Sequence, residues 1–336
     1  MVGLLQLSSG YVYQCEPGTD PTQCRMWNLE YDESAIQKHP ERLPTVNISS
    51  TVRTIWLMFD HYYYTRHEMM TRYDVQLHSK ILRDPSSVLL VDYQIKSIVI
   101  PESLSMGDFR NNFITEVETV PNRTYALQYL DLSHNNLRNV GNLTWLTQLK
   151  TLNLNRNRLN SVNPDTFSRM YDLQYLYLGD NSFFIVNLHH LPKTLTVLSL
   201  ARNYLRKLTL SELSLPALRE LDLENNQMTE LDLAALFKAF PALELLPIEY
   251  NAFPQEDAQR IIAGLKLHNV SLIVGHVSGD NVRCDSDEYR VDNLCFSYPI
   301  MGFRSVWKAI VLLSLMVFAV IAFVQSVRWV WHQMRY

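Results

Sequence analysis

The stretch that decides the fold is LQYLDLSHNNL at residues 127–137. Its spacing returns five times, in LKTLNLNRNRL (149–159), LQYLYLGDNSF (173–183), LTVLSLARNYL (195–205), LRELDLENNQM (218–228) and LELLPIEYNAF (243–253). The segments begin every 22 to 25 residues, and each fits L-x-x-L-x-L-x-x-N-x-L with occasional Ile, Met or Phe in a leucine position. Six copies in phase that all keep the asparagine argue against a chance run of leucines in amphipathic helices.

Weaker copies of the pattern precede the six regular ones. One begins at Leu104 and has apolar or Asn residues in the expected places, at Phe109, Asn112 and Ile114. Two more groups look like degenerate turns: Val52, Ile55 and Leu57, then Val88, Val91 and Tyr93. The repeat array therefore extends well upstream of residue 127.

The spacing predicts an α/β repeat fold, a leucine-rich-repeat solenoid. Alternating leucines point inward from a short strand, and successive strands stack about 4.8 Å apart into a parallel sheet on the concave face of a horseshoe. Each asparagine comes where the chain turns away, and its amide can pair with backbone groups left by the strands. We expect an internal, structural ladder of Asn135, Asn157, Asn181, Asn203, Asn226 and Asn251.

The four cysteines form two pairs at the ends of the array, Cys15 with Cys24 and Cys284 with Cys295. A stack of repeats needs a cap at each end, and the pairs lie where caps are needed. The layout predicts two disulfides and an oxidising compartment. Two alternatives remain: four reduced thiols, or a zinc site with His276 as a nearby extra ligand, although neither pair has zinc-knuckle spacing.

A membrane anchor is predicted near the C-terminus. Residues Ala309 to Val327 carry no charge, and at about 1.5 Å per residue they match the ~30 Å core of a bilayer. Lys308 and Arg328 flank the span, with tryptophans at both ends. At the other end, the first 14 residues resemble a signal peptide only faintly, because a basic region is lacking and Gln6 interrupts the apolar run.

The expected organisation has seven parts. They are an atypical or incomplete signal segment (1–14), an N-terminal cap (15–50), degenerate repeats (51–126), regular repeats (127–275), a C-terminal cap and stalk (276–305), a transmembrane helix (306–327) and a short tail (328–336). The tail is too short to fold into a signalling domain, so any signal must pass through a partner. The basic residues on either side of the span do not decide its orientation.

Four Asn-x-Ser/Thr triplets bear on orientation. They begin at Asn47, Asn122, Asn142 and Asn269, and each is an acceptor for N-glycosylation in the secretory pathway. Together with the cysteine pairs they favour repeats outside the cell and a single-pass protein of the plasma membrane. The alternative is a tail-anchored protein whose repeats face the cytosol.

The predicted partner-binding surface consists of the outward strand positions. This column is aromatic near its middle, at Tyr129, Tyr175 and Tyr177, and acidic towards its C-terminal end, at Glu220, Asp222 and Glu224. Exposed tyrosine favours protein interfaces because it covers much area with few rotatable bonds. We expect a protein ligand whose basic patch meets the carboxylates. The alternative is a solvated sheet in which tyrosine serves strand formation.

Other functions lack a motif. His67-Glu68 begins like a zinc-protease helix, but Thr71 stands where the second histidine is required. No glycine-rich phosphate loop and no G-x-S-x-G occurs, so the sequence predicts neither an enzyme nor a cofactor or metal site. The formal net charge of −4, without a dense basic cluster, argues against nucleic-acid binding. The aromatic run Tyr62, Tyr63 and Tyr64 after Trp56 is a second candidate for partner binding, but a place in the core of a degenerate repeat is favoured.

Two segments resemble the leucine-rich-repeat immune proteins of mosquitoes. They are YQCEPGTDPTQC at residues 13–24, followed by degenerate and then regular repeats, and LELLPIEYNAFPQEDAQRIIAGL at residues 243–265, which is similar to that family's final repeat and short helix. The resemblance covers roughly residues 11 to 275. It implies a role in haemolymph immunity, where some members pair through a coiled coil to bind a complement-like protein.

The chain departs from this family after the repeats. It has no heptad region and no adjacent double cysteine, and the apolar span stands there instead, as in the membrane-anchored branch. The departures put pairing and complement binding in doubt, and no binding residue is carried over. The leading hypothesis is a cell-surface receptor or co-receptor of innate immunity, and the alternatives are an adhesion or developmental surface protein and a tail-anchored cytosolic scaffold.

Overall fold

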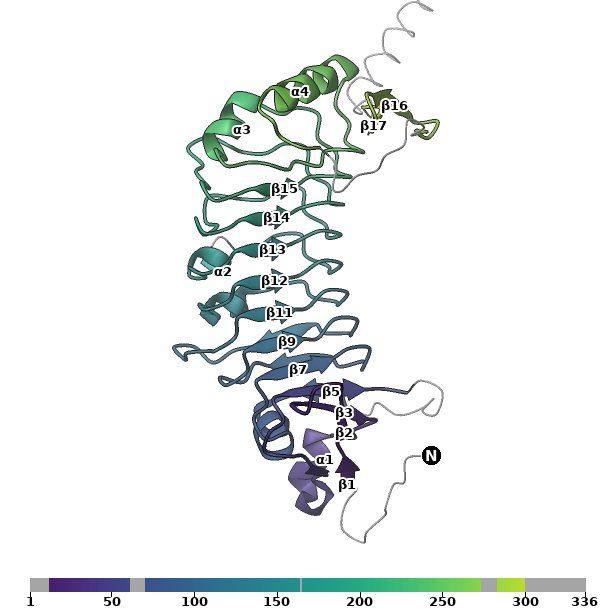
Figure 1. The fold of residues 1–336 in the computed structure, drawn as a ribbon, viewed down its shortest axis with the longest axis vertical. Coiled ribbons are helices and arrows are strands. Elements are labelled where there is room, and N and C mark those ends of the chain that lie inside the picture. The colour runs from purple at the N-terminus through teal and green to yellow at the C-terminus, as the bar shows by residue number, and fades with distance from the viewer. Residues whose placement is uncertain (1–11, 61–69, 164, 273–282, 300–336) are drawn as a thin grey trace, which may run out of the picture.

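The chain winds in successive turns into one elongated stack, as the computed structural model shows (Figure 1). The structure describes residues 12–60, 70–163, 165–272 and 283–299. Each turn adds one short strand to a sheet that runs along the whole stack. The repeat architecture predicted from the leucine spacing is confirmed.

The main sheet has ten strands, in the order β15-β14-β13-β12-β11-β9-β7-β5-β3-β2. Their bounds are β2 Glu16–Pro17, β3 Gln23–Trp27, β5 Thr54–Met58, β7 Ser87–Leu90, β9 Met106–Asp108, β11 Tyr129–Asp131, β12 Thr151–Asn153, β13 Tyr175–Tyr177, β14 Val197–Ser199 and β15 Glu220–Asp222. Neighbours pair in parallel, except β2 and β3, which are antiparallel. Because β5, β7 and β9 belong to this sheet, the degenerate segments are true turns of the stack.

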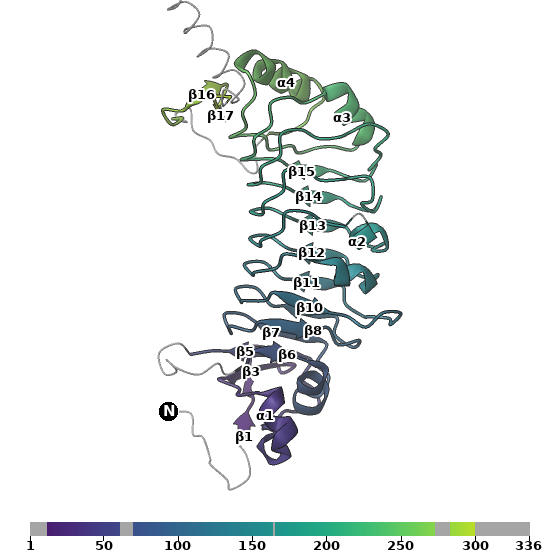
Figure 2. The same cartoon turned by 180° about the vertical axis from the view of Figure 1, so that it is seen from behind.

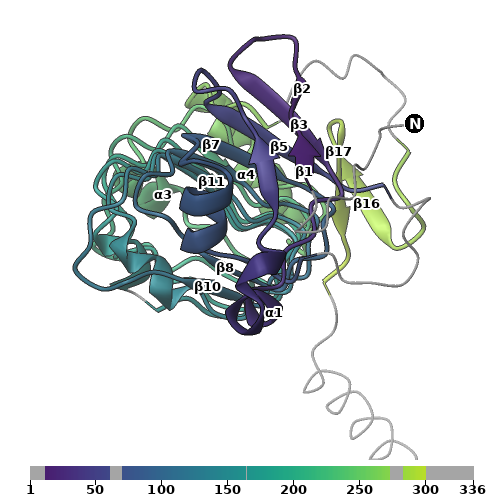
Figure 3. The same cartoon turned by 90° about the horizontal axis from the view of Figure 1, so that it is seen from below.

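The remaining elements cover the back and the ends of the stack (Figures 2 and 3). A shorter parallel sheet, β6 (Arg72–Tyr73), β8 (Ser97–Val99) and β10 (Glu116–Glu118), faces the main sheet across the core. Two strand pairs stand outside these sheets: β1 (Val12–Gln14) with β4 (Thr45–Asn47), and β16 (Glu288–Val291) with β17 (Leu294–Ser297). The helices are α1 Glu33–Lys38, η1 Pro40–Arg42, η2 Leu77–Ile81, η3 Gly141–Trp145, α2 Asp165–Ser168, α3 Leu233–Ala239 and α4 Gln255–Leu267.

The core is a column of leucines at matching repeat positions. Five of them are in register on successive strands and have no exposed area: Leu130, Leu152, Leu176, Leu198 and Leu221. Burying one such side chain contributes about 2 kcal/mol to folding. A single turn has no partner for its leucines, so the stack as a whole forms the core.

The asparagine ladder is present, and Asn181 shows how it works. Its Oδ1 accepts the backbone N–H of Leu159 in the preceding turn at 3.0 Å. Its Nδ2 donates to the carbonyls of Leu154, Leu178 and Gly179 at 2.9, 3.1 and 3.0 Å. Asn112 extends the ladder upstream of the six predicted members, with its Oδ1 accepting two N–H groups from the turn before. The predicted structural role of these residues is confirmed.

Both predicted cysteine pairs are disulfides in the structure, Cys15–Cys24 and Cys284–Cys295. Glu288 lies beside the second pair, but sulfurs joined in a disulfide offer no thiolate to zinc. The C-terminal hairpin β16–β17 is tied to the last repeat, because the Tyr250 N–H donates to the Cys295 carbonyl at 2.8 Å and the Tyr289 hydroxyl to the Phe253 carbonyl at 2.5 Å. The hairpin therefore closes the end of the stack.

No helix within the described ranges combines the length and apolarity needed to cross a bilayer. The predicted span, Ala309 to Val327, lies outside the described residues, so the membrane anchor stays a prediction. The same holds for residues 1–11 of the predicted signal segment and for Tyr62, Tyr63 and Tyr64.

Candidate protein-binding face

The outward side chains of the ten-stranded sheet form a continuous surface, here called the sheet face. Parallel register arranges them in rows that run across the strands, and neighbours within a row lie about 4.8 Å apart. The first row is Gln23, Thr54, Ser87, Met106, Tyr129, Thr151, Tyr175, Val197 and Glu220. The second row is Arg25, Trp56, Leu89, Asp108, Asp131, Asn153, Tyr177, Ser199 and Asp222. All the predicted binding residues on strands thus share this face.

The three predicted tyrosines lie on β11 and β13, with β12 between them. Tyr175 has 37% of its surface exposed, whereas Tyr129 and Tyr177 are half-buried. Burial, followed by the charge of Asp131, raises the pKa of Tyr129 to about 12. Burial and Glu220 likewise raise the pKa of Tyr177. The Tyr129 hydroxyl donates to Asp131 Oδ2 at 3.5 Å.

Polar groups between the tyrosines are fixed by bonds within the face. Asp131 and Ser133 are buried, and Asp131 accepts the Ser133 N–H at 2.8 Å. The Gly179 N–H donates to Asn155 Oδ1 at 2.6 Å. A Cβ at Gly179 would lie only 3.1 Å from that oxygen, which is tighter than an ordinary contact, so glycine suits this close approach. The middle of the face is therefore a rigid support for the tyrosines.

The acidic end of the face consists of Glu220 and Asp222 on β15 and Glu224 just after it. Burial raises the pKa of all three carboxyls, and the charge of Asp222 raises those of Glu220 and Glu224 further. Hydrogen bonds from the Glu224 N–H and the Ser199 hydroxyl, both at 3.1 Å, oppose the rise at Asp222. The charge of Arg202 lowers the pKa of Asp222 and Glu224 but does not cancel the rise, so a further cationic group placed against these carboxylates would be favoured.

Glu249 belongs to this acidic group, although the sequence reading did not include it. It stands two residues before Asn251, as Glu224 stands two before Asn226, so the repeat position alone could have indicated it. Burial raises its pKa, and the charges of Glu224 and Glu288 add to the rise. Its Oε1 accepts the Cys295 N–H at 3.4 Å, which links the acidic end to the C-terminal hairpin.

The N-terminal end of the face is aromatic and was also missed. Trp27 is 39% exposed, and its Nε1 donates to Glu16 at 3.1 Å. The Arg25 guanidinium lies over the Trp56 ring, 5.2 Å from the centroid. Trp56 is thus partly exposed on the sheet face and does not belong to the core. The alternation in QCRMW at residues 23–27 was the available signal, but it follows the cysteine-rich cap and not a regular repeat.

Two arginines at strand ends have their positive charge partly offset by one aspartate. Arg156 and Arg202 both lie near Asp180, with N–O distances of 3.4 and 3.9 Å. All three side chains are at least a third exposed, so these ion pairs are weak. The charge of the central face is therefore close to balanced, and the net negative charge is concentrated beyond β14.

A serine, a histidine and an aspartate meet at one place, but their hydrogen bonds do not suit catalysis. The Ser103 hydroxyl donates to Asp84 at 3.3 Å, so its oxygen accepts the Nε2–H of His78 at 3.0 Å. Burial keeps Tyr73 protonated, and its hydroxyl lies 2.6 Å from His78 Nδ1. The basic lone pair of the imidazole thus faces Tyr73 and cannot take a proton from the serine.

The sequence is also similar to known proteins. Residues 126–146 and 147–194 match two family models described as leucine-rich repeat. The chain has a leucine-rich-repeat solenoid fold. Human lumican is 29% identical over 207 residues, covering 61% of this chain and 52% of lumican. Human podocan-like protein 1 is 32% identical over 154 residues, covering 42% and 30%. The chain thus spans about half or less of these relatives' length.

A crystal structure of the LRIM1/APL1C complex shares this fold. It matches 91% of this chain and 56% of the compared chain, with a TM-score of 0.51 and 17% identity. At this identity the likeness shows the fold alone. The solenoid confirms the repeat class, which serves protein binding in many settings, while the partner has to be argued from the surface.

Proposed function

We propose that this chain recognises a protein ligand through the sheet face. The observation that carries the proposal is one surface on which Tyr175, an exposed aromatic side chain, lies two strands from the partly desolvated carboxylates of Glu220 and Asp222. A partner that places Lys or Arg against these carboxylates and an apolar surface against Tyr129, Tyr175 and Tyr177 would complement both parts. Glu224 would contribute to the acidic part.

The cellular role that we propose is recognition in innate immunity, as a cell-surface receptor or co-receptor. The resemblance of residues 13–24 and 243–265 to the mosquito immune family supports it. Both disulfides suit an oxidising compartment. In this proposal the apolar span Ala309 to Val327, predicted from the sequence, anchors the chain in the plasma membrane with the repeats outside. A second protein in the same or another membrane carries the signal.

The placement of the four sequons favours the same orientation. Asn47, Asn122, Asn142 and Asn269 are all exposed, and all lie outside the ten strands of the main sheet. Glycans at these positions would leave the sheet face open to a partner. A tail-anchored cytosolic scaffold would require reduced cysteines, which the disulfides disfavour. An adhesion or developmental surface protein with the same fold remains the second candidate.

The test displays the full-length protein on cells and measures binding of fluorescently labelled, heat-killed bacteria and fungi. Tyr175→Ala/Tyr177→Ala and Glu220→Lys/Glu224→Lys should each reduce binding by about tenfold, because they remove anchors or reverse the charge. Tyr171→Ala is the matched control, since this tyrosine is 66% exposed but lies in the turn before β13.

The outcomes separate the candidates. Loss of microbial binding in the face variants, but not in the Tyr171 control, supports the proposal. Clustering of the displaying cells with one another, without microbial binding, identifies an adhesion protein. Microbial binding that both face variants leave unchanged excludes the sheet face as the binding surface.

A further inference from the structure

A second apolar surface lies on the flank of the stack, away from the sheet face. The fifth residue after each ladder asparagine is aliphatic in six turns: Val117, Val140, Val162, Val186, Leu208 and Leu231. Val117 and Val140 are buried, at 5% and 3% exposure. The last four are only half-buried, although they are equally apolar. These four residues are called the flank column.

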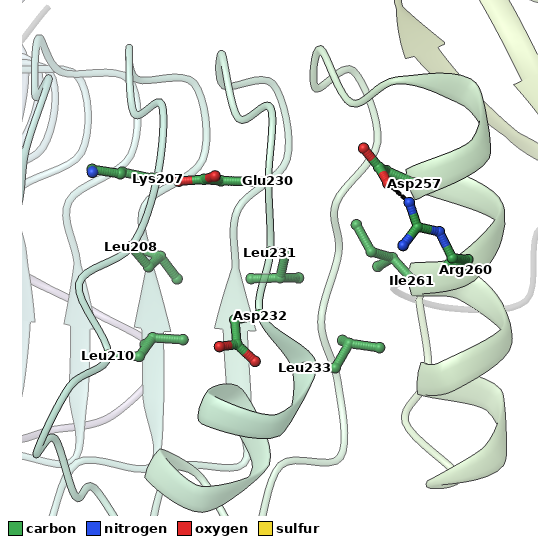
Figure 4. Close-up of a pocket in the computed structure, with 10 residues that line it drawn as sticks. All are labelled: Lys207, Leu208, Leu210, Glu230, Leu231, Asp232, Leu233, Asp257, Arg260 and Ile261. Atoms are coloured by element: carbon green, nitrogen blue, oxygen red, sulfur yellow. Dashed lines mark hydrogen bonds and ion pairs between the residues drawn. The ribbon is translucent and has the colours of Figure 1, made fainter.

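The half-buried residues line two hollows on consecutive turns. A hollow of about 160 Å³ lies against Val162 and Val186, with Phe167 and Ile185 beside them. A larger one of about 520 Å³ lies against Leu208 and Leu231 and reaches α4 (Figure 4). In Figure 4, Leu208, Leu231 and Ile261 lie in a row across three layers of the stack. The flank column therefore lines two neighbouring hollows, and the larger one is bordered by charged side chains, Asp232 among them, as well as by apolar ones.

Two opposite charges stand on one rim of the larger hollow. Lys207 and Glu230 directly precede the two leucines of the flank column, and both are exposed. Neither forms an ion pair with any residue that the structure describes. Arg260, farther along, is already paired with Asp257. The rim thus offers one cation and, one turn later, one anion that are both available to a ligand.

The spacing of the residues in the flank column fits an α-helix. Successive turns of the stack are about 4.8 Å apart, and successive turns of an α-helix are about 5.4 Å apart. A helix laid along the flank column would place one apolar side chain on each turn, with a mismatch of only about 2 Å over four turns. An extended peptide would present same-side residues about 6.8 Å apart and would fall out of phase sooner.

We infer that the flank column binds an amphipathic helix of a protein partner. One apolar residue per helical turn packs on Val162, Val186, Leu208 and Leu231. An acidic residue of that helix pairs with Lys207, and a basic residue three or four positions away pairs with Glu230. This surface is separate from the sheet face, so the two could be occupied by different proteins at the same time.

The probe is a designed, fluorescein-labelled helical peptide of about 18 residues, with Leu once per turn and one Glu–Lys pair four residues apart. Fluorescence anisotropy measures its binding to the purified full-length protein. We expect saturable binding that Leu208→Asp weakens at least tenfold. The control Thr209→Asp adds the same charge at the next residue, which is exposed and outside the hollow, and should change binding less than twofold.

A charge exchange tests the orientation of the helix. Lys207→Glu/Glu230→Lys should weaken binding of the first peptide several-fold and strengthen binding of a peptide whose Glu and Lys are exchanged. Three outcomes would overturn the inference. The first is the absence of saturable binding of either peptide up to about 1 mM, a concentration that corresponds to very weak affinity. The others are equal effects of Leu208→Asp and Thr209→Asp, and loss of binding in Tyr175→Ala/Tyr177→Ala. Thermal melting of each variant verifies that it is folded.

Discussion

In this solenoid, single side chains make hydrogen bonds to backbone groups that would be paired with other backbone groups in a longer helix or strand. A short three-residue strand leaves many N–H and C=O groups without a partner once the chain turns. In the Asn181 turn, one buried amide satisfies one N–H and three carbonyls drawn from two successive turns. The residue before it, Asp180, takes the left-handed conformation with φ of 51°, which completes the turn. Asparagine recurs because no other side chain supplies both donor and acceptor at this length.

Replacing Asn181 with alanine should therefore destabilise the protein by roughly 1–3 kcal/mol, because the buried Leu159 N–H loses its acceptor. The carbonyls of Leu154, Leu178 and Gly179 lose one donor but each keeps another, from Asn157, Asn203 and the Arg156 N–H. Chemical denaturation monitored by circular dichroism measures the change. Asn160→Ala is the matched control, because Asn160 is exposed, and its cost should stay below about 0.5 kcal/mol. Equal costs for the two variants would contradict the ladder's energetic role.

His78 is a second residue with a predictable effect, in this case on how the free energy of unfolding depends on pH. Burial lowers its pKa from 6.5 to about 4, against the opposing charge of Asp84. Between these values the unfolded chain binds a proton that the folded chain does not bind. The free energy of unfolding should therefore fall as pH drops from about 6.5 to 4, by roughly 3 kcal/mol in total.

The His78→Gln variant should lose most of this dependence, because glutamine cannot titrate. Thermal melts of the wild type and the variant at pH 7, 5.5 and 4.5 test the expectation. His189→Gln, at an exposed position, should keep the wild-type slope. A His78 variant with an unchanged slope would show that another group controls acid stability.

At the scale of elements, the ends of the stack differ from its middle. A central strand such as β13 has a parallel neighbour on each side. Beyond β15 the sheet continues only as single bridges through Leu245 and Ser271. The hairpin β16–β17 follows. Two backbone hydrogen bonds join it to the last repeat, from the Tyr250 N–H to the Cys295 carbonyl and from the Ser297 N–H to the Asn251 carbonyl, and Tyr289 stacks on Phe296 within it.

Removing the disulfide with Cys284→Ser/Cys295→Ser should loosen this hairpin without unfolding the repeats. A bridge closing a loop of this size contributes about 2–3 kcal/mol, chiefly through the entropy of the open chain. Limited proteolysis should then cut within residues 283–299 faster than in the wild type, while the regular repeats stay resistant. Cleavage throughout the chain would show that the cap holds the whole stack together.

At the scale of the whole molecule, the stack separates surfaces that a compact domain would merge. The sheet face carries the tyrosines and carboxylates, the flank column lines two hollows, and the sequons lie outside the main sheet. Because each turn contacts only its neighbours, each surface can change along the axis without disturbing the others.

If the repeats enter the secretory pathway, the four exposed sequons should carry glycans. The expressed full-length protein should then migrate faster on a gel after enzymatic removal of N-linked glycans. Replacing Asn47, Asn122, Asn142 and Asn269 with Gln should abolish the difference. A full-length, membrane-bound product without any shift would contradict the extracellular orientation and favour the cytosolic scaffold.

Several features could be predicted because they repeat. Leucine spacing determined the strands and the buried column, and the ladder asparagines followed from the same period, since one physical requirement recurs in every turn. Position at the ends predicted the two disulfides. Tyr129, Tyr175 and Tyr177 were assigned to the outward face for the same reason, because side chains alternate along a strand.

Only the tertiary structure decided how exposed each of these side chains is. Val140 and Val186 occupy the same repeat position, yet Val140 is buried and Val186 lines a hollow. Arg25 and Trp56 join the sheet face through the pairing of β3 with β5, across a cap that lacks the repeat. Periodicity fixes the direction in which a side chain points, and long-range packing fixes what covers it.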